Sequence, residues 1–160
     1  MMMNRDRVIR EIRAARKYDR RINLQEVSLG GADLSYLDLE DANLRGANLE
    51  GVVLQCADLW GADLRGANLR GADLQAADLK EADLRRACLA GVNFQAANLQ
   101  EADLRLANLQ GANLQRANLD GADMEGADVR ETDFRGSRLN GSRPVRLDNL
   151  SVDDEMDGGG

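Results

Sequence analysis

A five-residue repeat fills three-quarters of the chain and restricts what it can fold into. From Ile22 to Gly141 the sequence divides without insertion into 24 pentapeptides, such as ANLRG at 42–46. The central residue is Leu in 20 of the 24 repeats and another apolar residue in the rest. Two places earlier stands Ala in 17 repeats, and the residue between them is Asp or Asn in 20. Each repeat therefore offers one large and one small residue for burial.

This period fits neither an α-helix nor an unbroken strand. Five helical residues advance about 500°, which would scatter the Leu side chains around the helix. In a strand five is an odd number, so successive Leu side chains would face opposite sides of the sheet. All of them share one interior only if the chain turns once per pentapeptide and winds into stacked coils. The sequence thus predicts an all-β solenoid.

The number of pentapeptides in a coil follows from a longer period. Read every 20 residues, the position after the central Leu gives a column of Arg on one side and a column of Gln on another. The members of these columns are Arg45, Arg65, Arg85 and Arg105, and Gln55, Gln75, Gln95 and Gln115. Four pentapeptides per coil make six coils, and the expected rod is about 29 Å long.

The repeated A(D/N)L pattern resembles the pentapeptide repeat family over residues 22–141. The resemblance implies a right-handed quadrilateral β-helix with the central Leu and the preceding small residue pointing inward. It also makes a bacterial origin the expectation. The sequence departs from the motif at a few positions: Ser28, Val53, Cys88, Thr132, Ser137 and Arg138. Two of these replace the small Ala near the end of the repeats, so a less regular last coil is expected.

Two segments flank the repeats. Residues 1–21 carry eight basic and three acidic side chains, and Val8, Ile12 and Ala15 recur at helical spacing within residues 5–21. This predicts a basic amphipathic helix that caps the first coil, with binding to a membrane surface or an acidic partner as the alternative. Residues 142–160 form an acidic tail, expected to cover the last coil through Val145, Leu147 and Leu150 and to be partly disordered.

The composition argues against an enzyme. The chain has no histidine, the most frequent general base and metal ligand, and it has no nucleotide-binding loop or nucleophile elbow. Repeated Asp side chains on the walls of a rod are poor candidates for a unique catalyst. We therefore predict no catalytic residue, no cofactor and no metal. Cys56 and Cys88 fall on different sides of the rod, which predicts free thiols in a cytoplasmic protein without a transmembrane segment.

The surface suggests a binding role instead. The candidate interaction surface comprises the arginine column, Arg45, Arg65, Arg85 and Arg105, together with the only Trp, Trp60. The simpler interpretation of the column is a set of charge pairs with the Asp two residues earlier. The Gln column is expected to form side-chain amide ladders.

A fourth wall is strongly acidic. Its acids outnumber its two bases, and they are Asp38, Glu40, Asp41, Asp58, Asp78, Glu81, Glu101 and Asp120. The sequence predicts a rigid scaffold for an unidentified protein partner, with no direct nucleic-acid binding and with open ends and sides that permit association between copies. The alternative, implied by the resemblance, is a DNA mimic that binds DNA gyrase or another topoisomerase through the acidic wall. The family members known for that activity usually add a dimerising module or loops, which this sequence lacks.

Overall fold

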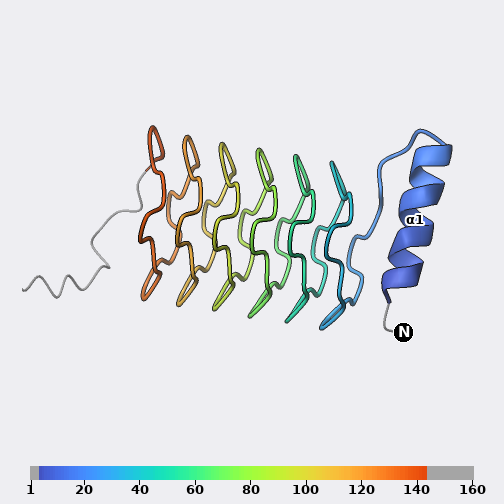
Figure 1. Ribbon diagram of the computed structural model, residues 1–160, viewed down its shortest axis with the longest axis horizontal. Helices are drawn as coiled ribbons and strands as arrows, with labels where there is room; N and C mark the ends of the chain where they lie inside the picture. Colours follow the sequence, from blue (N-terminus) through green and yellow to red (C-terminus); the bar gives the residue numbers. More distant parts are fainter. Residues whose placement is uncertain (1–3, 144–160) are drawn as a thin grey trace, which may run out of the picture.

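The computed structural model describes residues 4–143 as a rod of stacked coils with one helix lying across its end (Figure 1). Helix α1 spans Arg5–Lys17 and is the only helix among the described residues. From Ile22 onward the chain winds away from α1 and reaches the opposite end of the rod (Figure 1). The rod is therefore built in sequence order, one coil upon the next.

Parallel backbone bridges fix the register of the coils. Each bridge joins the second residue of a pentapeptide to the residue 20 positions later, from Asn23 with Asn43 to Asp123 with Arg143. A shift of 20 residues is four pentapeptides, which confirms the register predicted from the longer period. The bridges are isolated, and the described residues hold no extended strand, because the chain turns before a second residue can join the ladder. The β character thus lies in stacked single bridges.

The same hydrogen bonds recur in the pentapeptides from residue 22 to residue 121. In the repeat centred on Leu64, its N–H donates to the carbonyl of Asp83 at 2.8 Å, and the N–H of Gly66 donates to Arg85 at 3.0 Å. The N–H of Ala67 closes the turn on the carbonyl of Leu64 at 3.0 Å. Gly66 takes a φ of +64°, a conformation that favours glycine. Each turn is therefore tied both to itself and to the next coil.

The core runs along the axis of the rod. The central apolar side chains are buried from Leu24 to Val129, and even Phe94 is fully enclosed. The first residues of the repeats are buried from Ala42 to Ala127, whereas in the first coil Val27, Ala32 and Leu37 are only partly buried. The burial ends in the last coil, where Phe134 is only partly buried and Leu139 is 41% exposed. Thr132 and Ser137 stand there in place of Ala, and both are partly buried. In the inner coils each central Leu thus lies between the central residues of the preceding and following coils.

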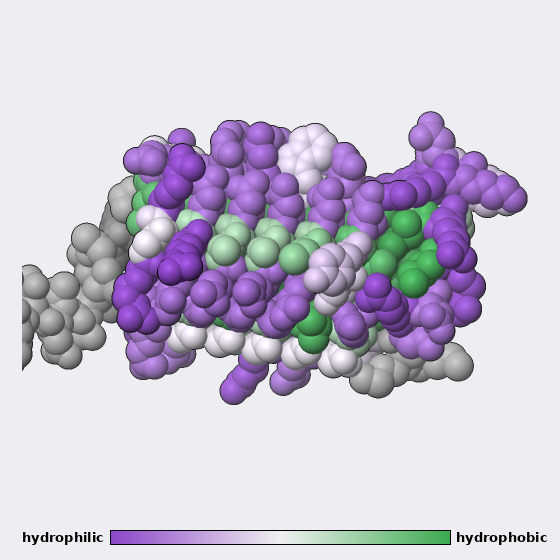
Figure 2. Space-filling model, in the orientation of Figure 1, coloured by the Kyte–Doolittle hydropathy of each residue, from purple (hydrophilic) through white to green (hydrophobic). Residues whose placement is uncertain are grey.

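Helix α1 packs its apolar side on the first coil. Val8, Ile12 and Ala15 are buried in the same apolar cluster as Ile22 and Leu24. Figure 2 shows a group of hydrophobic residues where the helix meets the solenoid. No helix among residues 4–143 has the length and apolar content needed to cross a membrane.

The helix is shorter than the sequence predicts. Asn4 begins it, accepting from the N–H of Arg7 at 3.1 Å, and Tyr18 ends it, short of the expected boundary at residue 21. Asp19 then takes a φ of +49°, which turns the chain toward the first coil. At the other end, the predicted cover of the last coil by Val145, Leu147 and Leu150 lies outside the described residues.

Candidate interaction surfaces

The arginine column is clamped by the aspartates of its own repeats. The Nε of Arg65 lies 2.8 Å from Asp63 Oδ1, and its Nη2 lies 2.6 Å from Asp63 Oδ2. Oδ1 also accepts the backbone N–H of Arg65 at 3.2 Å. Arg85 with Asp83, and Arg105 with Asp103, repeat this two-point contact. Two parallel hydrogen bonds fix the plane of each guanidinium group as well as its position.

The clamps are linked from coil to coil. Arg65 Nε lies 3.4 Å from Asp83 Oδ2, Arg85 Nε lies 3.4 Å from Asp103 Oδ2, and Arg105 Nε lies 3.9 Å from Asp123 Oδ2. Each of these arginines therefore has one carboxylate in its own coil and a second in the next. The result is a lattice of alternating charges along one wall, and the repulsion between stacked arginines is offset within it.

Ionisation in the lattice follows these contacts. The hydrogen bonds from Arg65 lower the pKa of Asp63, although partial burial of the carboxyl opposes the shift. At Asp103 the opposing effect of burial is the largest, yet the bonds from Arg105 leave the pKa of Asp103 lowered. The hydrogen bonds with Asp63 raise the pKa of Arg65. The lowered pKa of Asp63 and the raised pKa of Arg65 keep both members of this pair charged at neutral pH.

Arg45 is the exception in the column. The repeat of Arg45 has Asn43 at the second position, and Asn43 Oδ1 accepts only the backbone N–H of Arg45, at 3.2 Å. Among residues 4–143 no carboxylate lies within ion-pair distance of its guanidinium group. The four predicted arginines therefore comprise three clamped groups and one exposed, unpaired cation at the end of the column nearer α1.

The predicted glutamine ladder is wrong. Gln55 Nε2 donates to Asp73 Oδ2 at 2.7 Å, and in the part of the chain that the structure describes no Gln amide of this column bonds to another. The ladder instead runs through the second position of the same repeats, one residue before the central apolar residue. Asn113 Nδ2 donates to Asn93 Oδ1 at 3.1 Å, and Asn93 Nδ2 donates to Asp73 Oδ1 at 3.0 Å. The shorter Asn side chain is held beside the bridge, where amides of successive coils meet at the coil spacing.

Trp60 lies on the neighbouring wall, around the corner from the arginine column. Its side chain is 38% exposed, and its backbone N–H donates to Asp58 Oδ1 at 3.0 Å. Its carbonyl accepts the N–H of Asp41 at 2.8 Å. The backbone of Trp60 is therefore fixed on both sides, and its indole is a partly exposed aromatic group on a rigid base.

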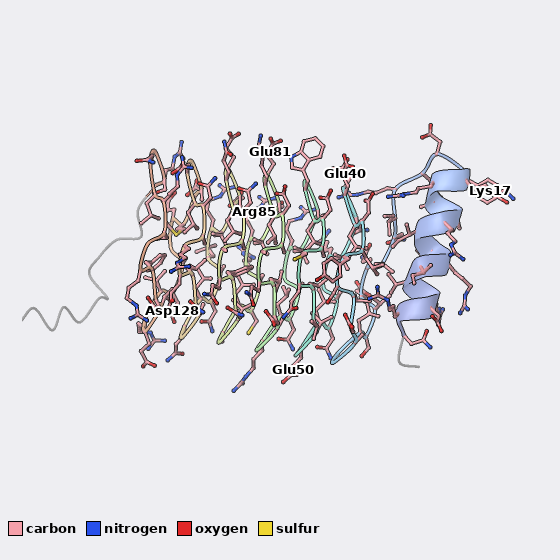
Figure 3. The ribbon with its side chains drawn as sticks, in the orientation of Figure 1. Lys17, Glu40, Glu50, Glu81, Arg85 and Asp128 are labelled. Atoms are coloured by element: carbon pink, nitrogen blue, oxygen red, sulfur yellow. The ribbon has the colours of Figure 1, made fainter. Side chains whose placement is uncertain are left out.

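The acidic wall keeps much of its charge. Glu40 and Glu81 project from the same edge of the rod (Figure 3). Three of the acids of this wall are paired, Asp38 with Arg16, Glu81 with Lys80 and Asp120 with Arg138. Within residues 4–143 the others have no ion-pair partner: Glu40, Asp41, Asp58, Asp78 and Glu101. Oxygens of Asp38, Glu40 and Asp58 lie within 4.8 Å of one another, close enough to share a cation, but Arg16 already binds Asp38.

Charged side chains of α1 complete the open edge of the first coil, which sequence reasoning missed. Arg5 donates to the backbone carbonyls of Asp33 at 2.7 Å and Ser35 at 3.0 Å. Glu11 Oε1 accepts the backbone N–H of Asn23 at 3.2 Å. In the other coils, the backbone groups at the same positions bond to the backbone of the preceding coil. The apolar spacing of the helix indicated a cap, but no sequence signal indicated which polar groups would replace the missing coil.

An open groove lies where the C-terminal end of α1 and the segment that follows it meet the first coil. It measures about 640 Å³, and charged residues dominate its lining, among them Arg16, Arg20, Asp38 and Glu40. The thiols of Cys56 and Cys88 are both free, as their placement on different walls predicts. Neither thiol lines the groove, which carries charge of both signs without a nucleophile.

Comparison with known proteins assigns the fold to a family. The family model for pentapeptide repeats matches residues 22–55, 53–91, 87–126 and 102–141, in eight copies. The chain belongs to the pentapeptide repeat family. No protein of curated function matches it by sequence.

Three solved pentapeptide repeat structures illustrate the likeness. HetL from the cyanobacterium Nostoc, involved in regulating heterocyst differentiation, is 26% identical, with 75% of this chain and 79% of HetL covered and a TM-score of 0.32. Rfr23 from the cyanobacterium Cyanothece is 27% identical, with 84% and 97% covered and a TM-score of 0.40. QnrB1, a plasmid-mediated fluoroquinolone resistance protein, is 15% identical, with 77% and 79% covered and a TM-score of 0.24.

Proposed function

We propose that this protein is a non-enzymatic scaffold, a right-handed β-helix of about six coils that binds another protein through the clamped arginine lattice. The lattice carries the proposal. Arg65, Arg85 and Arg105 remain about 40% exposed while their aspartates hold them by two-point contacts. A side chain that is ordered before binding loses little conformational entropy when a partner arrives.

The lattice also suggests what the partner looks like. Because each guanidinium is matched by a carboxylate, the wall offers a periodic pattern of donors and acceptors rather than a net positive charge. A partner with polar groups repeated at the coil spacing of about 4.8 Å fits this pattern. Arg and Trp are enriched at the centres of protein interfaces, so Trp60, around the corner, supplies an aromatic anchor at the margin. Arg45, which is free of the lattice, adds a local positive charge.

Affinity capture from the native cell tests this function. The wild-type protein is compared with R65Q/R85Q/R105Q and with a control, R70Q/R86Q/R116Q, which removes the same charge from arginines that have no ion-pair partner among residues 4–143. We expect one partner to be retained by the wild type and the control and lost by the lattice variant. A partner lost equally from both variants contradicts the proposal. Thermal unfolding of all three proteins verifies that the fold is intact.

The unpaired carboxylates of the acidic wall favour a second function, that of a DNA mimic acting on DNA gyrase. Asp58 and Asp78 are bridged in neighbouring coils, and with Glu101 they supply negative charge to one wall of a rigid support. The test is a gyrase supercoiling assay with the wild type and with D58N/D78N/E101Q. This function requires inhibition at micromolar wild-type protein and its loss in the variant. Normal supercoiling in the presence of the wild type rules it out.

We also propose that the protein works in the cytoplasm, which its two free thiols support. Association between copies, end to end or side by side, is part of the same proposal, because the last coil leaves Leu139 exposed. Cell fractionation tests the location, and light scattering over a range of protein concentrations tests the association. A monomer at all concentrations refutes the second point.

A further inference from the structure

The basic residues of the N-terminal segment divide into two groups. Four of them are engaged with the solenoid or the helix: Arg5 with Asp33, Arg16 with Asp38, Arg20 with Glu11, and Arg21 with the carbonyl of Asp41. The other four are exposed and have no ion-pair partner within residues 4–143: Arg7, Arg10, Arg13 and Lys17. We call this second group the outer basic face. These four residues are the cationic side chains of α1 that form no ion pair with the solenoid or within the helix.

The outer basic face points away from the rod. Val8, Ile12 and Ala15 face the first coil, and residues three and four apart on a helix share a side, so Arg10, Arg13 and Lys17 lie opposite them. Figure 3 shows Lys17 projecting from α1 on the side away from the coils. Lys17 Nζ lies 5.2 Å from the ring centroid of Tyr18, which is itself 67% exposed. The exposed Asp6, four residues before Arg10, lies on the same side, so positive charge predominates on the outer side of α1 but does not cover it alone.

We infer that the outer basic face docks the protein, end on, onto an anionic lipid membrane surface. The apolar side of α1 is buried in the cap, so the helix does not insert into lipid as a free amphipathic helix does. What remains is electrostatic attraction between clustered cations and a negatively charged leaflet. This mode requires a flat cluster of cations at an extremity of the molecule, which is where α1 lies (Figure 1).

The size of the face argues against a protein partner. A helix of 13 residues is about 20 Å long, and with a width of about 10 Å it offers roughly 200 Å². A stable protein interface buries about 800 Å² on each partner and has an apolar centre. The outer edge of α1 is hydrophilic in Figure 2. A charged plane needs no matching shape, so the small area is not an obstacle to membrane binding.

The orientation also limits repulsion by the acidic solenoid. Residues 22–141 carry eleven basic and twenty acidic side chains, and a rod lying flat would bring its acidic wall against the leaflet. Standing on α1, the rod places successive coils about 4.8 Å further from the membrane. The Debye length is about 8 Å at physiological salt, so carboxylates beyond the second coil are largely screened. Docking by α1 with the rod upright is therefore the favoured geometry.

Vesicle sedimentation tests the inference with the whole protein. The probes are phosphatidylcholine vesicles with and without 30% phosphatidylserine, at low and physiological salt. We expect binding only to the anionic vesicles, weakening as salt rises. In R10Q/R13Q/K17Q the affinity should fall about a hundredfold, since each cation near a leaflet contributes about fivefold. The control R70Q/R86Q/R116Q, with the same net charge, should bind as the wild type does.

The single Trp reports the orientation. Trp60 is in the second coil, so end-on docking keeps it out of the bilayer, and vesicles with brominated acyl chains should leave its fluorescence unquenched. Quenching of Trp60 fluorescence would overturn the upright geometry.

The inference itself fails if the wild type does not bind anionic vesicles at low salt, or if the control loses as much affinity for them as the α1 variant. It fails also if duplex DNA at equal phosphate concentration binds as tightly. Because these tests leave the arginine lattice intact, their outcome is independent of the proposed scaffold function.

Discussion

Enlarging one interior alanine tests the packing on which the rod depends. Ala72 is the first residue of its pentapeptide, and it is 1% exposed. At the same position one coil away on either side stand Val52 and Val92, both completely buried. The backbone bonds from Asp73 N to Val52 O and from Asn93 N to Ala72 O, each 2.9 Å long, hold these coils at a fixed spacing. Ala72 therefore has no space for a larger side chain between the two valines.

Ala72→Leu adds three carbon atoms at this point. Overpacking a close-packed core lowers the free energy of unfolding by about 1 to 3 kcal/mol. Because valines flank this site on both sides, we expect a loss of about 3 kcal/mol. For a chain of this size the melting temperature should fall by roughly 6 to 12 °C. Gln75→Leu introduces the same side chain three residues later, at an exposed position, and should change stability by less than about 0.5 kcal/mol.

Urea unfolding followed by circular dichroism measures both variants. A second substitution, Val92→Ala, frees space beside the enlarged side chain and should recover about 1 kcal/mol in the double mutant, a coupling expected only between residues in contact. Equal destabilisation by Ala72→Leu and Gln75→Leu would refute the assignment of inside and outside. Strict additivity of Ala72→Leu and Val92→Ala would refute the contact between the two coils.

Three further changes test the turns, the lattice and the cap. Ala76→Gly should stabilise the protein by about 0.5 to 1 kcal/mol in thermal unfolding, because Ala76 has a φ of +55°; an unchanged or lower melting temperature contradicts this. Arg65→Gln should lower the melting temperature at pH 7 slightly, because it removes a two-point contact with Asp63 at a partly exposed site. Since Arg65 lowers the pKa of Asp63, this stabilisation is complete above the unfolded Asp pKa of about 4 and is lost as the pH falls through the folded value, so a deficit that does not shrink as the pH falls below about 4 is evidence against it. Glu11→Ala should speed hydrogen exchange at the Asn23 amide, measured by NMR, and unchanged protection there would show that Glu11 does not complete the first coil.

The repeat made the architecture predictable from local information. A Leu at every fifth position cannot be buried by a helix or a strand, so the turn at each pentapeptide follows from the sequence alone. The 20-residue register followed as well, because residues stacked in a solenoid share an environment and therefore a composition. The clamp of Arg65 by Asp63 was predictable for the same reason, since two residues of one repeat lie on one wall whatever their neighbours do.

Polar side chains that bond between coils were harder to predict. Gln75 and Asn93 both recur in columns, and composition favoured the longer Gln for a ladder, yet the ladder runs through Asn93 because only the position beside the bridge holds successive amides in contact. The length of α1 and its bonds to Asp33 and Asn23 depended on an edge that exists only once the first coil has formed.

The sequence by itself thus determined the turns, the register and the identity of the buried residues, because each is set by a pattern repeated within five or twenty residues. Only the tertiary structure decided which charges are used and which stay free. Arg5 and Arg10 belong to the same helix and have the same side chain, but Arg5 meets the open edge of the first coil while Arg10 faces away from it. That difference arises from how α1 lies on the end of the rod, a contact between segments that no local pattern encodes.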